Sequence, residues 1–288
     1  MKFPSKRVML FNGAAFLVMA AGAIAAVRHN ISPPQTAPCS ERYGRLTTFQ
    51  LERDGTLVTS SEIQAASDGM DRGVDTNLSV RRIKDGPATV ALGVTMDAGT
   101  GPMGAKVGKA GGVSFPWVPR ALPDKVEAAC LSYDVFLGAD FEFAAGGTLP
   151  GILGNQDGEL ISNLKADRFD VHAQWGPLGL AKQYMVLSTA KNSLDLTVPA
   201  FTYTFPRGRW FKIEQEVVLN SPGEQNGIVR LWVDGRLRLE GRDAELRYRP
   251  DVYVAGVIAD THFGGHYLDS RAAKKEQIWL TPFQLRWN

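Results

Sequence analysis

The chain has few of the features that would assign it to a functional class at once. It contains only two cysteines and four histidines in 288 residues, and its net charge is +2. No block of basic residues stands out, so nucleic acid is not an expected partner. Internal repeats, low-complexity tracts and long stretches of helical periodicity are also missing. The 30 glycines and 16 prolines suit a turn-rich β fold instead.

The N-terminus has the pattern of an export signal. Lys2, Lys6 and Arg7 form a positively charged start, and residues 8–27 are almost wholly apolar, with an A-x-A pattern at 23–25. One interpretation is a signal peptide that is cleaved. The alternative is an uncleaved inner-membrane anchor, since the apolar run is about long enough to span a bilayer. Both interpretations place the rest of the protein in the periplasm or outside the cell.

The two cysteines, Cys39 and Cys130, both follow this apolar segment. An oxidising compartment permits a disulfide between them, which would fasten the N-terminal segment to the rest of the fold. A buried free thiol at Cys130 within a strand is the other interpretation. The sequence leaves both open.

Three segments are predicted along the chain. Residues 1–27 form the signal peptide or membrane anchor, residues 28–76 a linker with an N-terminal extension, and residues 77–288 a β domain. The linker is largely polar and contains a Pro-Pro pair at 33–34. The extension shows short strand signals and no strong helical periodicity.

Strand signals recur regularly from residue 113 onward, with turn residues between several of them. The expected strands are 130–143, 168–175, 182–187, 211–220, 228–233, 236–240, 253–258 and 276–287. Asp234 and Gly235 between two alternating runs predict a tight hairpin, because both central residues of a type I′ turn take positive φ. This pattern predicts an all-β fold, a jelly-roll sandwich of two antiparallel sheets.

The most informative motif is Gly-Gly-Thr-Leu-Pro-Gly-Ile-Leu-Gly at residues 146–154. Its glycines and its X-Pro step predict a tight corner with exposed backbone after the strand 130–143. The motif resembles the Gly-Gly-Lys-Leu-Pro-Gly corner of polysaccharide lyase family 14, the alginate and glucuronan lyases. The resemblance covers residues 77–288 and includes Tyr-Asp-Val-Phe at 133–136, a hairpin at 210–235 and Phe-Gly-Gly at 263–265.

The resemblance implies a jelly roll with a concave substrate-binding face and an acidic polysaccharide as partner. The family's reactive groups do not carry over. The family's active-site lysine is Thr148 here, and its Ser-x-Arg-x-x-Trp strand has Asp170 and His172 in place of the serine and arginine. Of the family's Tyr-x-Tyr pair, only the first tyrosine remains, as Tyr184.

The residues at these positions still form a coherent set. Strand periodicity places Asp170, His172 and Gln174 on one face, with the intervening apolar residues on the other. Cleavage of a uronate polymer by β-elimination needs a neutralised carboxyl group, a base for the neighbouring carbon and an acid for the leaving oxygen. His172 and Tyr184 can supply the base and the acid. Gln174, together with Arg168 at the strand start, can hold the carboxyl group.

Three further residues are expected to contact the polymer. The hydroxyl of Thr148 can hydrogen-bond a sugar, and Asp170 belongs to the same polar stripe. Trp117, which follows a glycine-rich loop at 99–112, is either a stacking platform for a sugar or a core residue. No cofactor and no metal are predicted.

Other functions remain as alternatives. A Tyr–His–Gln set on a β face also suits a non-catalytic polysaccharide-binding or cell-surface assembly protein, so the sequence does not establish an enzyme. Asp170 with Glu214 or Glu216 would be the carboxylate pair of a glycoside hydrolase, if their separation allowed it. His172, His262 and His266 would be the ligands of a metal site. A structural protein without a sugar ligand is the remaining class, because fold does not imply function.

Overall fold

The computed structural model describes residues 36–102, 109–156, 167–188, 193–264 and 270–288. The predicted signal or anchor segment and His266 lie outside these ranges. Residues 37–288 form one compact unit. None of the helices found within the described ranges is long and apolar enough to cross a membrane.

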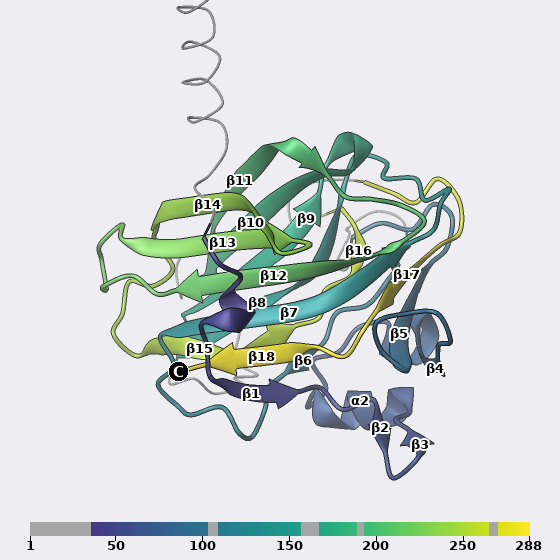
Figure 1. Cartoon of the computed structure of the whole chain (residues 1–288), viewed down its shortest axis with the longest axis horizontal. Coiled ribbons are helices and arrows are strands. Elements are labelled where there is room, and N and C mark those ends of the chain that lie inside the picture. Colours follow the sequence, from purple (N-terminus) through teal and green to yellow (C-terminus); the bar gives the residue numbers. More distant parts are fainter. Residues whose placement is uncertain (1–35, 103–108, 157–166, 189–192, 265–269) are drawn as a thin grey trace, which may run out of the picture. The chain divides into compact units, whose positions relative to one another are not determined.

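Two antiparallel sheets face each other in this unit, with the nine-stranded sheet in front and the seven-stranded sheet behind it in Figure 1. The nine-stranded sheet contains, in spatial order, β14 (Arg236–Ala244), β13 (Gly227–Val233), β12 (Trp210–Val218), β7 (Ala128–Leu137), β17 (Glu276–Leu280), β5 (Val90–Met96) and β4 (Leu78–Arg82), with β18 (Gln284–Trp287) and β1 (Arg45–Thr48) branching from β7. The seven-stranded sheet contains β11 (Ser193–Thr204), β10 (Leu180–Ser188), β9 (Arg168–Trp175), β8 (Gly147–Gln156), β15 (Val252–Ile258) and β6 (Pro116–Trp117), with β16 (His262–Phe263) beside β8.

This arrangement confirms the predicted all-β jelly-roll sandwich. The short remaining elements are a hairpin of β2 (Glu52–Arg53) and β3 (Thr56–Leu57), the helices α2 (Ser60–Ala66) and α3 (Val74–Asn77), and the 3₁₀ turns η1 (Cys39–Glu41) and η2 (Pro177–Gly179). The predicted hairpin between β13 and β14 is confirmed too, since Asp234 and Gly235 have φ angles of 52° and 70°.

The core lies between the sheets and explains the strand alternation. Phe169, Val171, Ala173 and Trp175 of β9 are fully buried in it, as the period of two predicts. Burial of each large apolar side chain contributes about 1.5–3 kcal/mol. The opposite side chains of β9 therefore point away from the core, on the outer face of the seven-stranded sheet.

The motif at 146–154 is a buried strand rather than an exposed corner. Most of it lies in β8, where Leu149 and Pro150 form a bulge between the pairs Thr148–Gln174 and Gly151–His172. The bulge suits proline, which cannot donate to a strand ladder. Tyr133 Oη and Gln215 Nε2, both from the other sheet, donate to the Pro150 carbonyl oxygen at 2.8 and 2.6 Å. The glycine-rich sequence thus permits close packing and a bond between the sheets.

The long strand predicted over 130–143 also ends earlier than expected. Strand β7 stops at Leu137, and a turn follows in which the Phe141 amide donates to the Gly138 carbonyl oxygen. Phe141 and Phe143 are nevertheless buried against the core. Their apolar side chains extend the strand pattern in the sequence, although they are inserted from a loop.

The N-terminal extension contains a helix that its periodicity did not predict. Helix α2 is seven residues long, too short to show several turns of apolar repeat. A capping box defines its start: Glu62 N donates to Thr59 Oγ1, and Thr59 N donates to the Glu62 carboxylate. The extension also adds β1 to the nine-stranded sheet, paired with β18.

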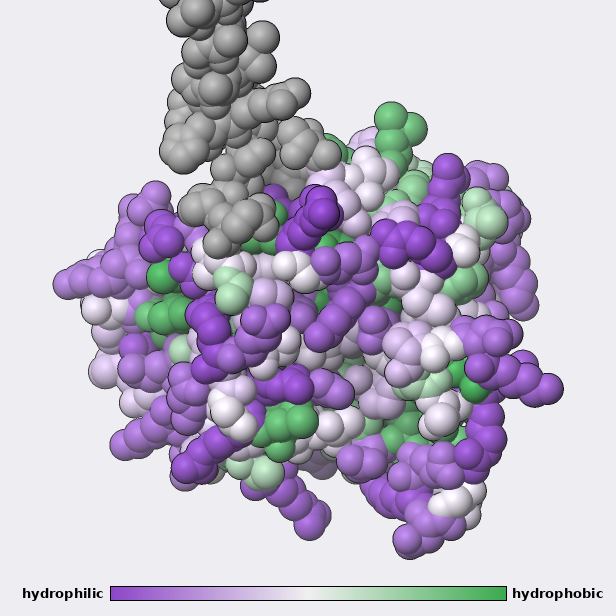
Figure 2. All heavy atoms as spheres, viewed as in Figure 1, coloured by the Kyte–Doolittle hydropathy of each residue, from purple (hydrophilic) through white to green (hydrophobic). Residues whose placement is uncertain are grey.

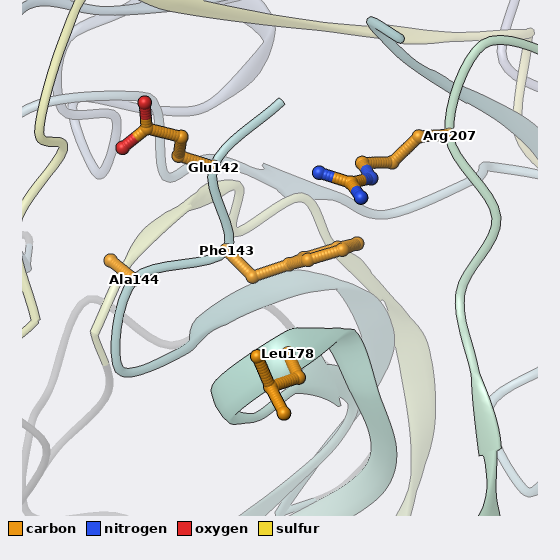
Figure 3. Close-up of a pocket in the computed structure, with 5 residues that line it drawn as sticks. All are labelled: Glu142, Phe143, Ala144, Leu178 and Arg207. Atoms are coloured by element: carbon orange, nitrogen blue, oxygen red, sulfur yellow. The ribbon is translucent and has the colours of Figure 1, made fainter. Parts of the chain in front are cut away.

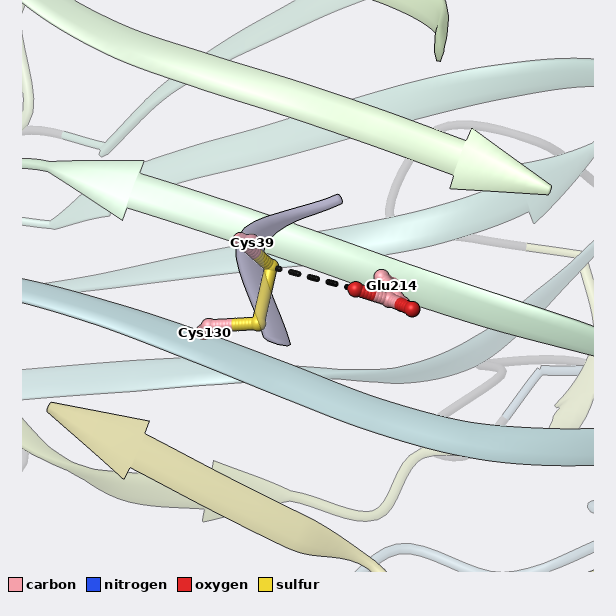
Figure 4. Close-up of side chains that lie close together, drawn as sticks. All are labelled: Cys39, Cys130 and Glu214. Atoms are coloured by element: carbon pink, nitrogen blue, oxygen red, sulfur yellow. Dashed lines mark hydrogen bonds between the residues drawn. A yellow bond between two sulfur atoms is a disulfide. The ribbon is translucent and has the colours of Figure 1, made fainter. Parts of the chain in front are cut away.

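A disulfide joins Cys39 of η1 to Cys130 of β7, which resolves the alternative left open by the sequence (Figure 4). It holds η1 against the outer face of the nine-stranded sheet. The Glu214 carboxylate lies 3.8 Å from Cys39 Sγ and accepts a hydrogen bond from Ser40 N at 3.0 Å. Figure 2 shows the same side of the molecule as mostly hydrophilic, with small separate hydrophobic areas.

An ion-pair network lies beside this disulfide. Glu216 accepts hydrogen bonds from Tyr43 at 2.7 Å, Arg42 at 2.8 Å and Arg230 at 2.7 Å. Arg230 also donates to Glu240 at 2.5 Å. Burial acts to raise the pKa of Glu216, but the hydrogen bonds from Arg42, Arg230 and Tyr43 together hold it below its usual value. The carboxylate therefore remains charged in a buried position.

Candidate functional site

Polar side chains gather on the outer face of the seven-stranded sheet, over its central strands. We call this set the polar face. It comprises Thr148 from β8, Arg168, Asp170, His172 and Gln174 from β9, Lys182 and Tyr184 from β10, and Asp260 and His262 from the segment after β15.

Strand pairing brings most of the predicted residues into two neighbouring rows. Tyr184 and Gly151 lie directly opposite His172 on either side, and Thr148 and Lys182 lie opposite Gln174. Directly opposite residues of an antiparallel pair have Cβ atoms about 4.5–5.5 Å apart. His172 and Tyr184 are therefore neighbours, as the proposed base and acid require.

The row at Gln174 is tied to the loop beside it. Gln174 Nε2 donates to Thr148 Oγ1 at 3.1 Å, and Thr148 Oγ1 donates to the Gly264 carbonyl oxygen at 2.9 Å. Thr148 and Gln174 are 3% and 6% exposed. Thr148 thus positions Gln174. Because Thr148 is itself buried, a sugar on this face would contact Gln174 rather than the Thr148 hydroxyl.

The imidazole of His172 is held through Nδ1, and its Nε2 points toward Asp260. Nδ1 lies 3.3 Å from the Leu149 carbonyl oxygen, which is freed by the β8 bulge. Nε2 lies 3.8 Å from Asp260 Oδ2. Because a carbonyl oxygen only accepts, the first contact requires the proton on Nδ1 and leaves the Nε2 lone pair available. His172 can therefore accept a proton at Nε2, next to a carboxylate that stabilises the resulting cation.

Charge and burial change the acidity of two neighbours. Burial raises the pKa of Asp170, an effect opposed by His172 and Arg168. Burial also lowers the pKa of His262, against the attraction of Asp260. His262 Nδ1 lies 3.1 Å from the Phe263 carbonyl oxygen. A neutral His262 beside Asp260 leaves that carboxylate to interact with His172.

The structure separates two residues that the sequence analysis combined. Arg168 and Gln174 lie at opposite ends of β9, six positions apart. At a rise of about 3.3 Å per residue, this distance is about 20 Å, too far for both to hold one carboxyl group. Lys182 is the cation opposite Gln174. Within the described ranges Lys182 forms no ion pair or hydrogen bond, so its charge is available to a ligand.

The prediction for Trp117 as a sugar platform needs correction. Trp117 pairs with Val257, a fully buried core residue, and therefore points to the inner side of the sheet. Its ring lies 5.4 Å from that of Phe49. Trp117 is a core-packing residue, the alternative that the sequence had left open.

The carboxylate pair considered for glycoside hydrolysis is also separated. Asp170 lies on the outer face of one sheet, whereas Glu214 and Glu216 lie on the outer face of the other, bonded to η1 and its neighbours. Packed sheets are about 10 Å apart before the side chains on the outer faces are counted. The pair cannot act on one glycosidic bond.

The suggested three-histidine metal site is only partly described, since His266 lies outside the described ranges. His172 and His262 both lie near Asp260. Each histidine points Nδ1 at a carbonyl oxygen. That orientation leaves a single nitrogen on each for any ligand.

Sequence reasoning missed Asp260, His262 and Lys182. Asp260 lies in a loop, and His262 had been considered only as a metal ligand. Lys182 lies at the start of a predicted strand, and its alternation with Tyr184 could have identified it. No local signal places Asp260, because its position depends on how the segment between β15 and β16 runs along the edge of β8, opposite β9.

The fold agrees with comparisons to known proteins. Residues 85–283 match the family model described as Polysaccharide lyase 14. The fold is similar to a PL-14 alginate lyase from Aplysia kurodai, with a TM-score of 0.63 and 23% identity over 79% of this chain and 94% of that one. It is also similar to alginate lyase vAL-1 from Chlorella virus, with a TM-score of 0.57 and 18% identity over 74% and 90% of the two chains.

An endo-β-1,4-glucuronan lyase from the fungus Trichoderma reesei has the same fold, with a TM-score of 0.52 and 12% identity over 77% of this chain and 89% of that one. A search of the curated proteins finds no match. The architecture is thus that of a jelly-roll polysaccharide lyase. The chain belongs to the polysaccharide lyase 14 family, whose model covers most of its length.

Proposed function

We propose that the protein is a lyase that cleaves an acidic, uronate-containing polysaccharide by β-elimination on the polar face. The observation that carries the proposal is the direct cross-strand pairing of His172 with Tyr184 on that face. The family membership and the fold shared with alginate and glucuronan lyases support an anionic polymer as substrate.

His172 is the proposed base. Its Nε2 removes the proton from the carbon beside the sugar carboxyl group, and Asp260 at 3.8 Å stabilises the imidazolium that forms. Tyr184 is the proposed acid, whose phenol protonates the leaving glycosidic oxygen. Two groups on adjacent strands can reach the carbon and the oxygen of one linkage from the same side.

The carboxyl group of the reacting sugar is proposed to lie over Gln174 and Lys182. These two residues are opposite each other, one row along the strands from His172. A cation near the carboxylate favours the negative charge that develops when the neighbouring proton leaves. Arg168, at the other end of β9, would bind a different sugar of the same chain.

Incubation with alginate and with glucuronan tests this proposal. Elimination creates an unsaturated, ultraviolet-absorbing end group, which hydrolysis and binding do not. Tyr184→Phe should reduce the rate of absorbance increase, whereas the matched variant Tyr248→Phe, at a 45% exposed tyrosine away from the polar face, should not. Absence of the unsaturated product with every uronan tried would count against the lyase.

A non-catalytic polysaccharide-binding protein is the second candidate. The observation that favours it is the replacement of the family's active-site lysine by Thr148, whose hydroxyl is already committed to Gly264. A threonine hydroxyl cannot supply a lysine's charge. Saturable binding of uronans without product, unaffected by Tyr184→Phe, would support this candidate over the lyase.

We also propose that the protein is exported. The apolar segment at 8–27 and the disulfide between Cys39 and Cys130 both fit an oxidising compartment outside the cytoplasm. Fractionation of cells that produce the full chain tests this, with N-terminal sequencing to separate a cleaved signal from a retained anchor. Recovery of the whole protein in the cytoplasmic fraction would contradict it.

A further inference from the structure

A second surface feature lies where β9 and β10 meet. A pocket of about 330 Å³ is lined by the five residues drawn in Figure 3, which are Glu142, Phe143, Ala144, Leu178 and Arg207. Its size is at the lower end of the range of about 300–1,000 Å³ that is usual for small-molecule sites. None of its lining residues belongs to the polar face.

Arg207 is held in place without a carboxylate partner in the described parts of the chain. Its Nη1 donates to the Phe141 carbonyl oxygen at 3.0 Å, and its guanidinium lies 5.5 Å from the centre of the Phe143 ring. An arginine that is already held by a carbonyl oxygen and an aromatic ring loses little further conformational freedom when it binds a ligand. Its remaining N–H groups are available to a carboxylate, which it can bind through two parallel hydrogen bonds.

Leu178 gives the pocket an exposed apolar side. It is 86% exposed, and its φ of 60° is one that residues with a side chain seldom adopt. In the view of Figure 3 the Phe143 ring lies between Leu178 and the guanidinium of Arg207. Backbone conformations of this kind cluster at active sites and ligand-binding segments, and the C–H face of a sugar ring is a suitable partner for the exposed Leu178 side chain.

The pocket adjoins the polar face through two shared segments. Leu178 belongs to the turn between β9 and β10, and a side chain added at Gly176 of the same turn would meet Lys182 Nζ at 2.9 Å. Phe143 and Ala144 lead directly into β8, where Thr148 is located. A polymer that passes over Gln174 and Lys182 therefore meets this turn and the pocket next.

We propose that Arg207, with Phe143 and Leu178, forms an accessory site for a second uronate of the same polysaccharide chain. This rests on the proposed function, because it assumes a uronate polymer on the polar face. The cations Arg168, Lys182 and Arg207 then follow one path along the surface, each available to a carboxylate of the repeating acidic chain. Glu142, also on the pocket wall, can accept hydrogen bonds from the sugar hydroxyls and repels a carboxylate placed on its side.

The test is binding of glucuronate and alginate oligosaccharides of defined length, measured by calorimetry on the folded chain. Arg207→Gln should weaken binding of an octasaccharide about tenfold, as expected for loss of a charge-assisted hydrogen bond. Binding of a trisaccharide, which the polar face alone can hold, should stay the same. Arg207→Lys should restore part of the loss, because it keeps the charge but not the bidentate geometry.

Arg209→Gln is the matched control. Arg209 is exposed, lies two residues away and pairs with Asp234 at 2.7 Å, outside the pocket. Equal effects of the two substitutions, or an equal loss for the trisaccharide and the octasaccharide, would overturn the accessory site. Leu178→Ser provides a second variant at an exposed position, expected to weaken only the octasaccharide. Failure of the unaltered protein to bind any uronan would overturn the proposed function and this site with it, whereas normal binding without an Arg207 effect overturns this site alone.

Discussion

The two outer faces of the sandwich both carry charged and polar side chains, yet they use them differently. On the nine-stranded sheet, the buried Glu216 is bonded to Tyr43, Arg42 and Arg230, so its charge is balanced by two cations and a further hydrogen-bond donor. On the polar face, His172 contacts a backbone carbonyl, and Lys182 has no partner among the described residues. Charges that satisfy one another hold a fold together, whereas groups with remaining capacity can act on a ligand.

The largest expected difference between the faces concerns activity. His172→Asn should reduce the rate of unsaturated-product formation about 10²–10⁴-fold, the usual contribution of a general base. Asparagine can still donate to the Leu149 carbonyl oxygen, so thermal unfolding should change little. Steady-state rates on the most active uronan measure the effect. Unchanged turnover in a folded variant would remove His172 from the mechanism.

A substitution on the other face should have the opposite consequence. Glu216→Ala leaves the buried Arg230 without one of its carboxylates, and breaking such a pair costs about 3–5 kcal/mol of folding free energy. Urea unfolding measures this loss. Activity per folded molecule should be retained, because Glu216 lies on the sheet opposite to His172. A loss of turnover at full stability would break the distinction between the two faces.

The disulfide belongs to the same stabilising face. Replacing Cys39 and Cys130 together by serine should lower the free energy of unfolding by about 2–4 kcal/mol, mainly because the unfolded chain gains freedom when a loop spanning 91 positions is opened. Parallel urea titrations of the variant and of the unaltered protein with and without reductant provide the measurement. Reductant should destabilise only the unaltered protein. If reductant also destabilised the double serine variant, its effect would not come from this disulfide.

The smallest expected difference is in pH dependence. The pKa of Glu216 is lowered in the folded state, so its stabilising contribution is present above its unfolded pKa and is lost as the pH falls through the folded pKa. The pKa of Asp170 is raised, chiefly by burial, so its ionised form costs stability above the folded pKa. This cost decreases as the pH falls below the folded pKa and is gone below the unfolded pKa.

Asp170→Asn should therefore stabilise the protein near neutral pH and lose that advantage in acid. Glu216→Gln should destabilise it near neutral pH and have a smaller effect in acid. Urea unfolding of both variants at neutral pH and below about pH 4 compares them. If Asp170→Asn instead destabilised the protein at neutral pH, the attraction of the Asp170 carboxylate to Arg168 and His172 would outweigh the cost of its burial.

Much of the candidate site could be predicted from local pattern. The alternation of β9 placed Asp170, His172 and Gln174 on one face because the side-chain period of a strand is fixed. The predictions that were wrong depended on distances and directions that the sequence does not show. Arg168 and Gln174 lie on the same face of β9 but too far apart to hold one carboxyl group. Trp117 follows a loop, but its side chain points inward beside Val257.

The sequence alone determined the sandwich, the hairpin at Asp234 and Gly235 and the outward polar stripe, because these follow from the geometry of single strands and turns. Tertiary structure decided which strands became neighbours. Register placed Tyr184 opposite His172 and Lys182 opposite Gln174. The pairing of β15 and β16 along the same edge of β8 brought Asp260 to His172. It also converted the Leu-Pro-Gly segment into a buried bulge, because only the packed opposite sheet could supply Tyr133 and Gln215 to the Pro150 carbonyl oxygen.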